Sequence, residues 1–404
     1  MEEWKEYKLG DLIKLSSGGT PDKKNDSYWG GAIPWISAKS MYDDYLYSSD
    51  LTITNEGLIN GSRIAPVNSI LLLTRGSGLF NRIPVCLVKK EMAFNQDVKC
   101  LESKNQDIVS NLFLFYWLMG NKHEISAILE TTGIGAGKID TERLKNIKIN
   151  LPPVRTQKAL VQFAESIMLK IEVNRRLNDN LQQQTQALYK SWFIDFEPFQ
   201  NEEFIDSELG MIPKGWIVGD IYNYVDVIYG APYKSSMFND NKEGLPLIRI
   251  RDLKTNSPQF FTPEILPNTE YIEAGDIVAG MDAEFTPYLW LGEKGVLNQR
   301  CCKFKAKNNA ISNYYILFLV KPELEYVQSY KTGTTVSHLG KSDIDRFKFI
   351  IPPLDVILAF SEKVNYMKEE VVNRARESRH LAQLRDTLLP RLMSGELKLS
   401  ELTV

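Results

Sequence analysis

The chain carries one order of sequence landmarks twice. The segment LPP at 151–153 recurs as IPP at 351–353, a shift of 200 residues, and the stretches before the two Pro-Pro pairs also match. Segments 131–150 (TTGIGAGKIDTERLKNIKIN) and 331–350 (KTGTTVSHLGKSDIDRFKFI) each contain a Thr-Gly loop, a Gly-Lys pair and a short amphipathic stretch. Self-similarity at a fixed shift is the signature of a repeated structural unit. The sequence therefore predicts two versions of one fold.

The match extends back through each half. The pair NQ at 95–96 corresponds to NQ at 298–299, and the aromatic runs NLFLFYWL and NYYILFLV follow in the same order. Short apolar runs bounded by Gly, Pro, Asn and Asp predict several strands in each half, with one or two helices. Beyond the first Pro-Pro pair, residues 154–193 contain neither Gly nor Pro, and their apolar positions recur at helical spacing. That pattern predicts a long helix, and the second half repeats it.

These patterns define a fold class and a domain order. The predicted class is α+β: two mixed α/β domains separated by two long antiparallel helices that form a coiled coil, with a pseudo-twofold internal repeat. An acidic and then Pro/Gly-punctuated segment, FEPFQNEEFIDSELGMIPKGW, indicates a surface linker near residue 205. The predicted boundaries are 1–151 for the first domain, 152–204 for the first helical spacer, 205–351 for the second domain and 352–404 for the second helical spacer.

Seven-residue steps along both predicted helices mark a coiled-coil stripe with polar interruptions at matching places. The seam residues are Leu160, Ile167, Asn174, Leu181 and Leu188 in the first helix, and Phe360, Met367, Arg374, Leu381 and Leu388 in the second. Polar seam residues weaken such a pair but fix its register and partner. The alternative is that each amphipathic helix packs separately on its own domain, because polar seams also suit solvent-facing helix edges.

Composition excludes several classes of protein. A hydrophobic fraction of 43% and a charged fraction of 25% are ordinary for a soluble globular chain, and the most apolar run, 112–119, is far too short to span a bilayer. The charged amino terminus, MEEWKEYKLGD, lacks the apolar core of a secretory signal, so we expect a cytoplasmic protein with no membrane contact. A net charge of −3 argues against indiscriminate coating of nucleic acid.

The cysteines and histidines do not form a metal-binding pattern. Cys86, Cys100, Cys301 and Cys302 show no CxxC spacing, and the three histidines, His123, His338 and His380, are scattered along the chain. We therefore expect no metal site, and we expect the thiols to be small buried hydrophobes in a reducing compartment.

Catalytic motifs fail one by one. GIGAGK at 133–138 has three residues between its glycines where a P-loop has four, Ile139 replaces the Ser/Thr, and the twin carries Thr335 in place of the first glycine. The Pro-Pro pairs are followed by Val154 and Leu354 rather than the aromatic residue of an amino-methyltransferase tetrad. Asp386 with the Glu-Leu-Lys segment 396–398 lies outside any predicted sheet. No serine triad or HExxH motif is present. We expect no catalytic centre and no cofactor.

Recognition chemistry remains. In the first half, a predicted strand is followed by a Gly-rich turn that bears Arg75, Asn81 and Arg82. Arg and Asn/Gln are the side chains that pair bidentately with guanine and adenine edges. The second half replaces Thr74-Arg75 with Met281-Asp282, so the two halves are expected to read different bases. The alternative for each such residue is an exposed turn side chain, or one that bonds local backbone groups.

The chain resembles, over its whole length, the specificity subunits of type I restriction-modification systems. The resemblance depends on YKLGDLIKLSSGGTP followed by YWGGAIPWISAKSM, on the linker SELGMIPKGW, on both Pro-Pro helix starts and on the ending LRDTLLPRLMSGEL. It implies two target-recognition domains, each of which reads one half of a bipartite double-stranded DNA site. It also implies that the helices dock two modification (methyltransferase) subunits, and that restriction (motor and nuclease) subunits join this core.

The candidate DNA contacts lie in both halves. They are Thr20, Lys39, Thr74, Arg75, Ser77, Asn81, Arg82 and Lys138 in the first half, and Tyr233, Arg249, Arg251, Asp282, Asn298, Gln299, Arg300 and Lys341 in the second. Two alternatives stay open. One is a scaffold or inhibitor that binds modification subunits without reading DNA, and the other is a stand-alone methyltransferase or nuclease whose motifs are not recognisable.

Overall fold

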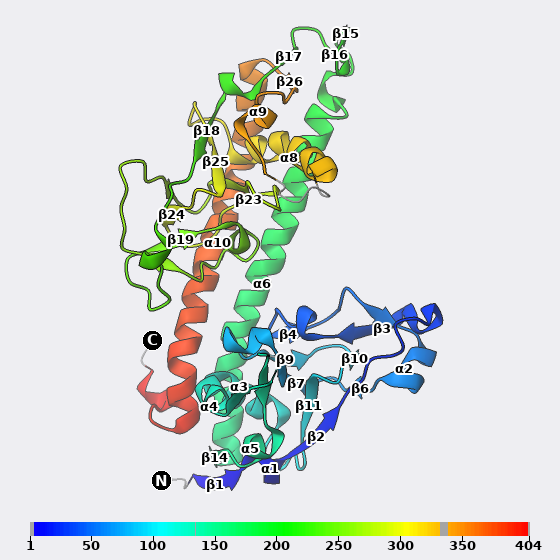
Figure 1. The fold of residues 1–404 in the computed structure, drawn as a ribbon, viewed down its shortest axis with the longest axis vertical. Helices are drawn as coiled ribbons and strands as arrows, with labels where there is room; N and C mark the ends of the chain where they lie inside the picture. The colour runs from blue at the N-terminus through cyan, green and yellow to red at the C-terminus, as the bar shows by residue number, and fades with distance from the viewer. Residues whose placement is uncertain (1–3, 134, 332–337, 403–404) are drawn as a thin grey trace. The chain divides into compact units, whose positions relative to one another are not determined.

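The computed structural model describes residues 4–133, 135–331 and 338–402 (Figure 1). The chain divides into two compact units: unit 1 comprises Met1–Leu169 together with Leu381–Val404, and unit 2 comprises Lys170–His380. Each unit holds mixed sheets, short helices and part of two long helices, so the predicted α+β class with two mixed domains is confirmed. Thr335 and Ile134, from the comparison with a P-loop, lie outside the described residues.

Unit 1 is built on a five-stranded sheet in the order β2-β11-β7-β9-β4 and a four-stranded sheet in the order β5-β3-β10-β6. Its strands are β1 (Lys5–Lys8), β2 (Ile13–Ser17), β3 (Trp29–Ile36), β4 (Tyr45–Leu46), β5 (Thr52–Ile53), β6 (Ile64–Ala65), β7 (Ile70–Leu73), β8 (Arg75–Gly76), β9 (Val85–Val88), β10 (Met92–Phe94), β11 (Val98–Ser103), β12 (Leu129–Thr131), β13 (Gly137–Ile139) and β14 (Lys148–Leu151). Its short helices are α1 (Leu9–Leu12), η1 (Asp26–Tyr28), η2 (Ala38–Ser40), α2 (Asn55–Gly61), η3 (Ser77–Phe80), α3 (Asn111–Gly120), α4 (Lys122–Ala127), α5 (Thr141–Lys145) and η7 (Leu399–Glu401).

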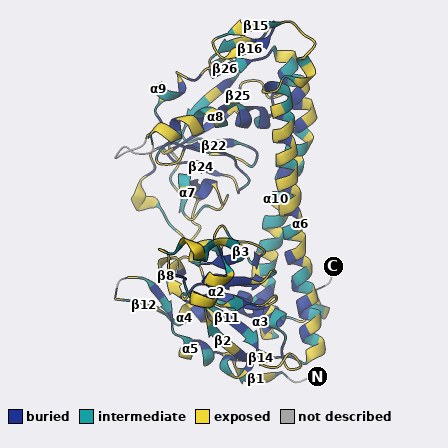
Figure 2. Ribbon diagram, turned by 90° about the vertical axis from the view of Figure 1, so that its right-hand side faces the viewer, coloured by how far each residue is buried: buried dark blue, intermediate teal, exposed yellow. Residues whose placement is uncertain are grey.

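The core of unit 1 forms where the aromatic run becomes α3. The Ser110 hydroxyl accepts a hydrogen bond from the Phe113 amide and caps this helix, whose residues from Phe113 to Gly120 are all buried. The fully apolar strand β7 lies in the middle of the five-stranded sheet, as expected for a strand covered on both faces. Figure 2 shows the buried residues concentrated in the strands and in this helix.

Unit 2 repeats this plan with fewer strands. Its main sheets follow the orders β18-β25-β22-β23 and β20-β19-β24-β21. The strands are β15 (Phe204–Ser207), β16 (Gly210–Pro213), β17 (Ile217–Gly219), β18 (Val225–Tyr229), β19 (Leu245–Ile248), β20 (Phe261–Thr262), β21 (Tyr271–Ile272), β22 (Ile277–Gly280), β23 (Pro287–Leu289), β24 (Gly295–Leu297), β25 (Cys301–Ala306) and β26 (Phe349–Ile351). The shorter helices are η4 (Glu197–Phe199), η5 (Ile221–Asn223), η6 (Ser235–Met237), α7 (Ile250–Leu253), α8 (Asn313–Lys331) and α9 (Lys341–Ile344).

Backbone hydrogen bonds show which positions of the two units correspond. The Asn95 amide donates to the Ile36 carbonyl at 2.9 Å, and the Asn298 amide donates to the Ile248 carbonyl at 3.1 Å. One parallel strand pair recurs as well, because β3 pairs with β10 in unit 1 and β19 pairs with β24 in unit 2. The repeat inferred from the sequence is therefore also a repeat of strand pairing.

The two Gly-Lys pairs, in contrast, are not equivalent. The Ile139 amide donates to the Thr74 carbonyl (2.9 Å), and the Leu339 amide donates to the Met281 carbonyl (2.7 Å), so the constant shift of 200 residues holds through this stretch. Lys138 therefore corresponds to His338. Lys341 begins α9 instead, one position after the residue that caps this helix.

The long helices are α6 (Val154–Phe193) and α10 (Leu354–Ser394). Within unit 2, the Asn178 amide nitrogen donates to the Val371 carbonyl at 3.1 Å and the Thr185 hydroxyl lies 3.3 Å from the Met367 sulfur. Partners thus fall along α10 as positions rise along α6, which is an antiparallel arrangement.

Four of the ten predicted seam residues have less than one-tenth of their surface exposed: Leu160, Ile167, Asn174 and Phe360. The other six are partly exposed: Leu181, Leu188, Met367, Arg374, Leu381 and Leu388. Packing of the coiled-coil type stays a prediction.

The four cysteines are all free and buried. Burial raises the pKa of the Cys86 thiol to about 12 and that of Cys100 to about 11, so both are protonated and unreactive at neutral pH. Among the described residues, no helix combines the length and the apolar character needed to cross a membrane.

Candidate nucleic-acid interface

In unit 1 the structure brings three of the predicted contacts together around one hollow of about 350 Å³. Its lining residues are Thr74, Arg75, Gln96, Asp97, Lys99, Lys138, Ile139, Asp140 and Thr141. Arg75 and Lys138 are direct partners across the antiparallel pair β8 and β13. Sequence analysis named Thr74, Arg75 and Lys138 as contacts, but it missed the other cation of this hollow, Lys99. We call this feature the unit 1 hollow.

A set of backbone bonds fixes the floor of the hollow. Both the amide and the hydroxyl of Thr74 donate to the Asp97 carbonyl, at 2.8 Å and 2.9 Å, and so join the end of β7 to the turn before β11. The buried Asn95 side chain accepts a hydrogen bond from the Asp97 amide at 3.2 Å, which is an Asx turn. This turn exposes Gln96, and the Thr20 hydroxyl donates to its side-chain oxygen at 2.7 Å. Thr20 and Thr74 therefore position neighbouring groups.

The charges of the hollow have defined surroundings. Burial lowers the pKa of Lys99; Arg75 lowers it further, whereas Asp97 opposes both effects. The Lys99 ammonium donates to the Ser17 hydroxyl at 2.5 Å. The backbone N–H groups of Arg143 and Glu142 hold the pKa of Asp140 below its ordinary value, so this carboxylate is ionised at neutral pH. Three cations against two carboxylates leave a local excess of positive charge.

In unit 2 the same backbone frame carries the opposite arrangement of charge. Asp282 takes the position of Arg75. The amide of its neighbour Met281 donates to the Arg300 carbonyl, just as the amide of Thr74 donates to the Asp97 carbonyl. The Asn298 side chain accepts from the Arg300 amide at 3.2 Å and repeats the Asx turn, which leaves Gln299 exposed.

Three charged or polar side chains meet at this place in unit 2. The guanidinium of Arg300 lies 3.3 Å from one carboxylate oxygen of Asp282, and Nδ1 of His338 lies 2.7 Å from the other. Sequence analysis named Asp282 and Arg300 but missed His338, although the constant shift from Lys138 points to it. We call this feature the unit 2 cluster.

Several predicted contacts have structural partners instead. Arg82 donates to the backbone carbonyls of Met41 and Tyr42. The Arg249 guanidinium lies over the Phe260 ring at 4.3 Å, and the Tyr233 hydroxyl, on a buried side chain, donates to Thr269 at 2.9 Å. These contacts explain the placement of the three side chains without DNA.

The remaining predicted contacts are exposed on short helices. Ser77 begins η3 and Asn81 is its C-cap, Lys39 lies in η2, Arg251 lies in α7 and Lys341 begins α9. Lys39 and Arg251 are equivalent, because each follows a strand residue, Ile36 or Ile248, whose carbonyl accepts a hydrogen bond from the Asn amide of the Asn-Gln turn. An exposed cation at this position is therefore common to both units.

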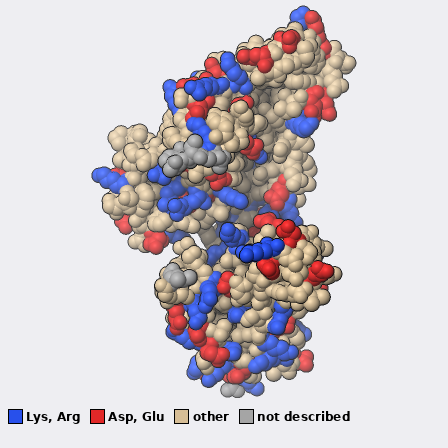
Figure 3. All heavy atoms as spheres, turned by 45° about the vertical axis from the view of Figure 1, so that its right-hand side comes forward, with Lys and Arg blue, Asp and Glu red and all other residues tan. Residues whose placement is uncertain are grey.

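The surface offers little to a catalytic interpretation. Among the described residues, no group of three or more His, Cys, Asp or Glu side chains could hold a metal ion. The carboxylates considered for a nuclease are bound to arginines, since Asp386 lies 2.8 Å from Arg385 and Glu396 lies 2.8 Å from Arg391. Figure 3 shows basic and acidic side chains interspersed over the face in view. The face in view is not uniformly basic, and the local clusters in units 1 and 2 are the candidates for DNA contact.

Comparison with known proteins assigns this two-unit fold to a class. The family model described as "Type I restriction modification DNA specificity domain" matches residues 1–183 and again 213–365. The chain is 28% identical to the type I restriction enzyme MjaIX specificity subunit of Methanocaldococcus jannaschii, over 99% of this chain and 95% of that protein. It is 32% identical to the EcoR124I/EcoR124II specificity subunit of Escherichia coli, over 40% of each chain.

A solved structure shows the same fold. The type I restriction-modification S subunit from M. genitalium superposes with a TM-score of 0.50 at 16% identity, over 97% of this chain and 96% of that one. The family-model match over most of the chain shows that it belongs to the family of type I restriction-modification DNA specificity proteins.

Proposed function

We propose that this chain is the subunit that selects the DNA sequence in a type I restriction-modification complex, and that each unit reads one half of a bipartite duplex target. The observation that carries the proposal is the unit 1 hollow together with the unit 2 cluster, where one backbone frame holds Arg75 and Asp97 in one copy and Asp282 and Arg300 in the other. A shared frame with different hydrogen-bonding groups is what two readers of different half-sites require. Recognition domains at 1–151 and 205–351, with spacers at 152–204 and 352–404, follow from the same repeat.

The chemistry of the two surfaces defines what each can read. The Arg75 guanidinium supplies the donor fork that suits the O6 and N7 edge of guanine, with Lys99 and Lys138 available to phosphates. Asp282 supplies acceptors, which suit an exocyclic amino group of cytosine, and Arg300 and His338 hold that carboxylate in place. Catalysis of base methylation belongs, in this proposal, to partner subunits in the cytoplasm.

The helices supply the spacing and the docking surface for two modification subunits, which the restriction subunits then join. At ~1.5 Å per residue, a helix as long as α6 spans ~60 Å, between one and two turns of B-DNA. Val173 and Leu177 lie one helical turn apart on α6, each with 41% of its surface exposed, and Tyr366 on α10 is 68% exposed. Exposed apolar side chains at helical spacing support binding of partner helices.

A length change tests the spacer. Deletion of one heptad from each long helix is expected to shorten the unread gap between the half-sites, with both half-site sequences retained. The gap is measured by mapping methylated bases in cells that carry the variant complex. An unchanged gap in a folded and assembled variant would contradict the role of the helices as a ruler.

The function as a whole is tested by co-expression of this chain with its modification subunit in a host that lacks DNA methylation. The expected result is a split motif with an unread gap, methylated only when this chain is present. Absence of methylation from an intact complex would instead favour a scaffold or inhibitor, and methylation by this chain alone would show a stand-alone enzyme.

A further inference from the structure

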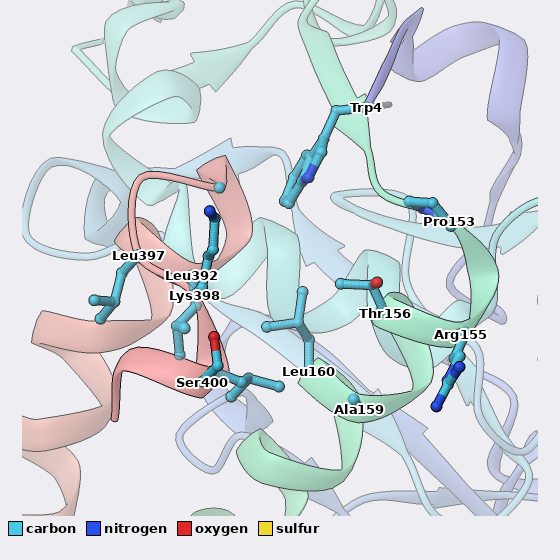
Figure 4. Close-up of a pocket in the computed structure, with 12 residues that line it drawn as sticks. Trp4, Pro153, Arg155, Thr156, Ala159, Leu160, Leu392, Leu397, Lys398 and Ser400 are labelled. Carbon is cyan, nitrogen blue, oxygen red and sulfur yellow. The ribbon is translucent and has the colours of Figure 1, made fainter. Parts of the chain in front are cut away.

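Unit 1 contains a second hollow, a groove of about 390 Å³ between the start of α6 and the end of α10 (Figure 4). Its lining residues are Trp4, Pro153, Arg155, Thr156, Ala159, Leu160, Leu392, Gly395, Leu397, Lys398, Leu399 and Ser400. The Trp4 indole and the leucine side chains make its apolar wall, while the exposed cations Arg155 and Lys398 lie at its rim. We call this feature the terminal groove; it takes no part in the candidate DNA surfaces.

Unit 2 shows what fills the equivalent place. At the shift of 200 residues, Leu160 and Leu392 of the terminal groove correspond to Phe360 and Trp192. The rings of Trp192 and Phe360 lie 5.9 Å apart, within one apolar cluster. Two leucine positions of the unit 1 groove thus carry larger aromatic side chains in unit 2, and these side chains pack on each other.

The segment after α6 completes this filling in unit 2. Phe199, the counterpart of Leu399, lies 6.1 Å from Trp192 and 5.1 Å from Trp216. Trp216 precedes β17 as Trp4 precedes β1, and both strands pair with the strand that enters a long helix. In unit 2, the counterpart of the groove thus contains the side chain of Phe199, which belongs to a turn of sequence Phe-Glu-Pro-Phe.

We propose that the terminal groove receives an aromatic side chain, with a carboxylate beside it, from one modification subunit. The aromatic packing at the counterpart in unit 2 indicates that the groove can accommodate an aromatic ring. The rim cations Arg155 and Lys398 complement a neighbouring carboxylate. Aromatic side chains in well-packed pockets are frequent anchors of protein interfaces. The proposal depends on the proposed function, because it assigns one docking point to a partner that the function requires.

The Phe-Glu-Pro-Phe turn of a second copy is not free to supply the ring, because it packs against Trp216 within unit 2, with Phe196 at 5.4 Å and Phe199 at 5.1 Å from the Trp216 ring. Because the counterpart in unit 2 is packed with its own aromatic side chains, an inserted side chain is expected only at unit 1.

Substituting two residues of unit 1 by their unit 2 counterparts tests the proposal. The double variant Leu160→Phe/Leu392→Trp fills the groove with its own side chains and is measured in the full-length chain, titrated with purified modification subunit and followed by native mass spectrometry. One of the two binding steps is expected to weaken at least 10-fold while the other is unchanged. The control Leu51→Trp adds the same indole at an exposed position outside the groove and is expected to change neither step.

A cross-linking experiment covers the case in which the double variant does not fold. A photoreactive benzoyl-phenylalanine is placed at exposed Ser400 on the rim, and the cross-linked peptide is identified by mass spectrometry. The expected partner is a peptide of the modification subunit that contains an aromatic residue. Cross-links only to this chain or to a second copy, or wild-type affinity of the filled variant at both steps, overturn the proposal. If the wild-type chain binds no modification subunit, it is the proposed function that fails.

Discussion

The unit 1 hollow and the unit 2 cluster have the same backbone frame, but the positions of the positive and the negative side chain are exchanged. In unit 1, Arg75 stands on the strand side and Asp97 on the Asn-Gln turn; in unit 2, Asp282 and Arg300 exchange these places. Arg300 and Asp282 form an ion pair at 3.3 Å that His338 extends. If each unit reads DNA as proposed, the shared backbone frame supplies the geometry and single side chains supply the readout. Recognition can therefore change in one unit without any change of fold.

The largest effect is expected when unit 1 is given the charges of unit 2. The double variant Arg75→Asp/Asp97→Arg should lower affinity for the cognate duplex by roughly 100-fold, since a bidentate base contact contributes about 1–3 kcal/mol and a carboxylate now faces the DNA. Fluorescence anisotropy with duplexes altered in one half-site measures this loss.

The matched swap, Asp282→Arg/Arg300→Asp, should change reading of the second half-site only. Loss of the second half-site by the unit 1 variant would mean that the halves are assigned to the wrong units.

The next largest effect concerns one interior strand position at which the two units differ. Lys303 on β25 is buried and lies 2.9 Å from both Glu270 and Asp276, whereas its counterpart on β11 is Cys100. Lys303→Met should lower the free energy of unfolding by about 1–2 kcal/mol, because it leaves two half-buried carboxylates without their cation. Urea denaturation measures the change, and the exposed neighbour variant Lys305→Met should shift it by under about 0.5 kcal/mol.

The difference in unfolding free energy between wild type and Lys303→Met has a defined pH dependence. Burial alone lowers the pKa of Lys303, but the hydrogen bonds to Asp276 and Glu270 outweigh it, and the net result is a pKa above the ordinary 10.5. A raised pKa means that the folded state holds the proton more tightly, so this contribution is complete at neutral pH. It is lost as pH rises above 10.5 through the higher folded-state value. A constant difference between wild type and Lys303→Met up to pH 11.5 would argue against the ionic account.

A smaller effect is expected at Lys99, for which unit 2 has Cys302 at the same register. Lys99→Met should reduce the slope of log affinity against log salt concentration by about one and weaken binding similarly for all sequences. Titrations at several salt concentrations, with cognate and mismatched duplexes, provide the test. A change confined to one base pair would show that Lys99 reads a base instead.

The smallest effect is expected at Arg82, which bonds the Met41 and Tyr42 carbonyls. Arg82→Ala should cost about 0.5–1.5 kcal/mol of stability and leave the salt slope unchanged. Thermal denaturation and the same salt titration distinguish the two roles. A slope of log affinity against log salt concentration reduced by about one, with unchanged stability, would instead indicate that Arg82 contacts DNA.

The sequence predicted the repeat, the long helices and several residues that the structure places around the unit 1 hollow and in the unit 2 cluster, because these depend on local patterns. Pro-Pro pairs and apolar periodicity specify where helices begin, and a turn after a strand specifies where Arg75 projects. The similarity of the two Gly-Lys pairs gave a wrong correspondence between Lys138 and Lys341. The strand register shows that Lys138 corresponds to His338. Lys99 and Asp97 were missed because a strand sequence does not reveal which neighbour lies across the hollow. Tertiary partners likewise fixed Arg249 on Phe260.

Unit 1 is made from two distant parts of the chain, and this has a consequence for synthesis. Leu389, Leu392 and Met393 belong to the same core cluster as α3, and the backbone at Leu389 and Pro390 lies against Gly120. Unit 2 is continuous from Lys170 to His380. On the ribosome, all of unit 2 has been translated before the last residues of unit 1 exist. The recognition domain that is translated first is therefore the last to complete its core, and a premature stop near the end of the chain damages the first domain rather than the second.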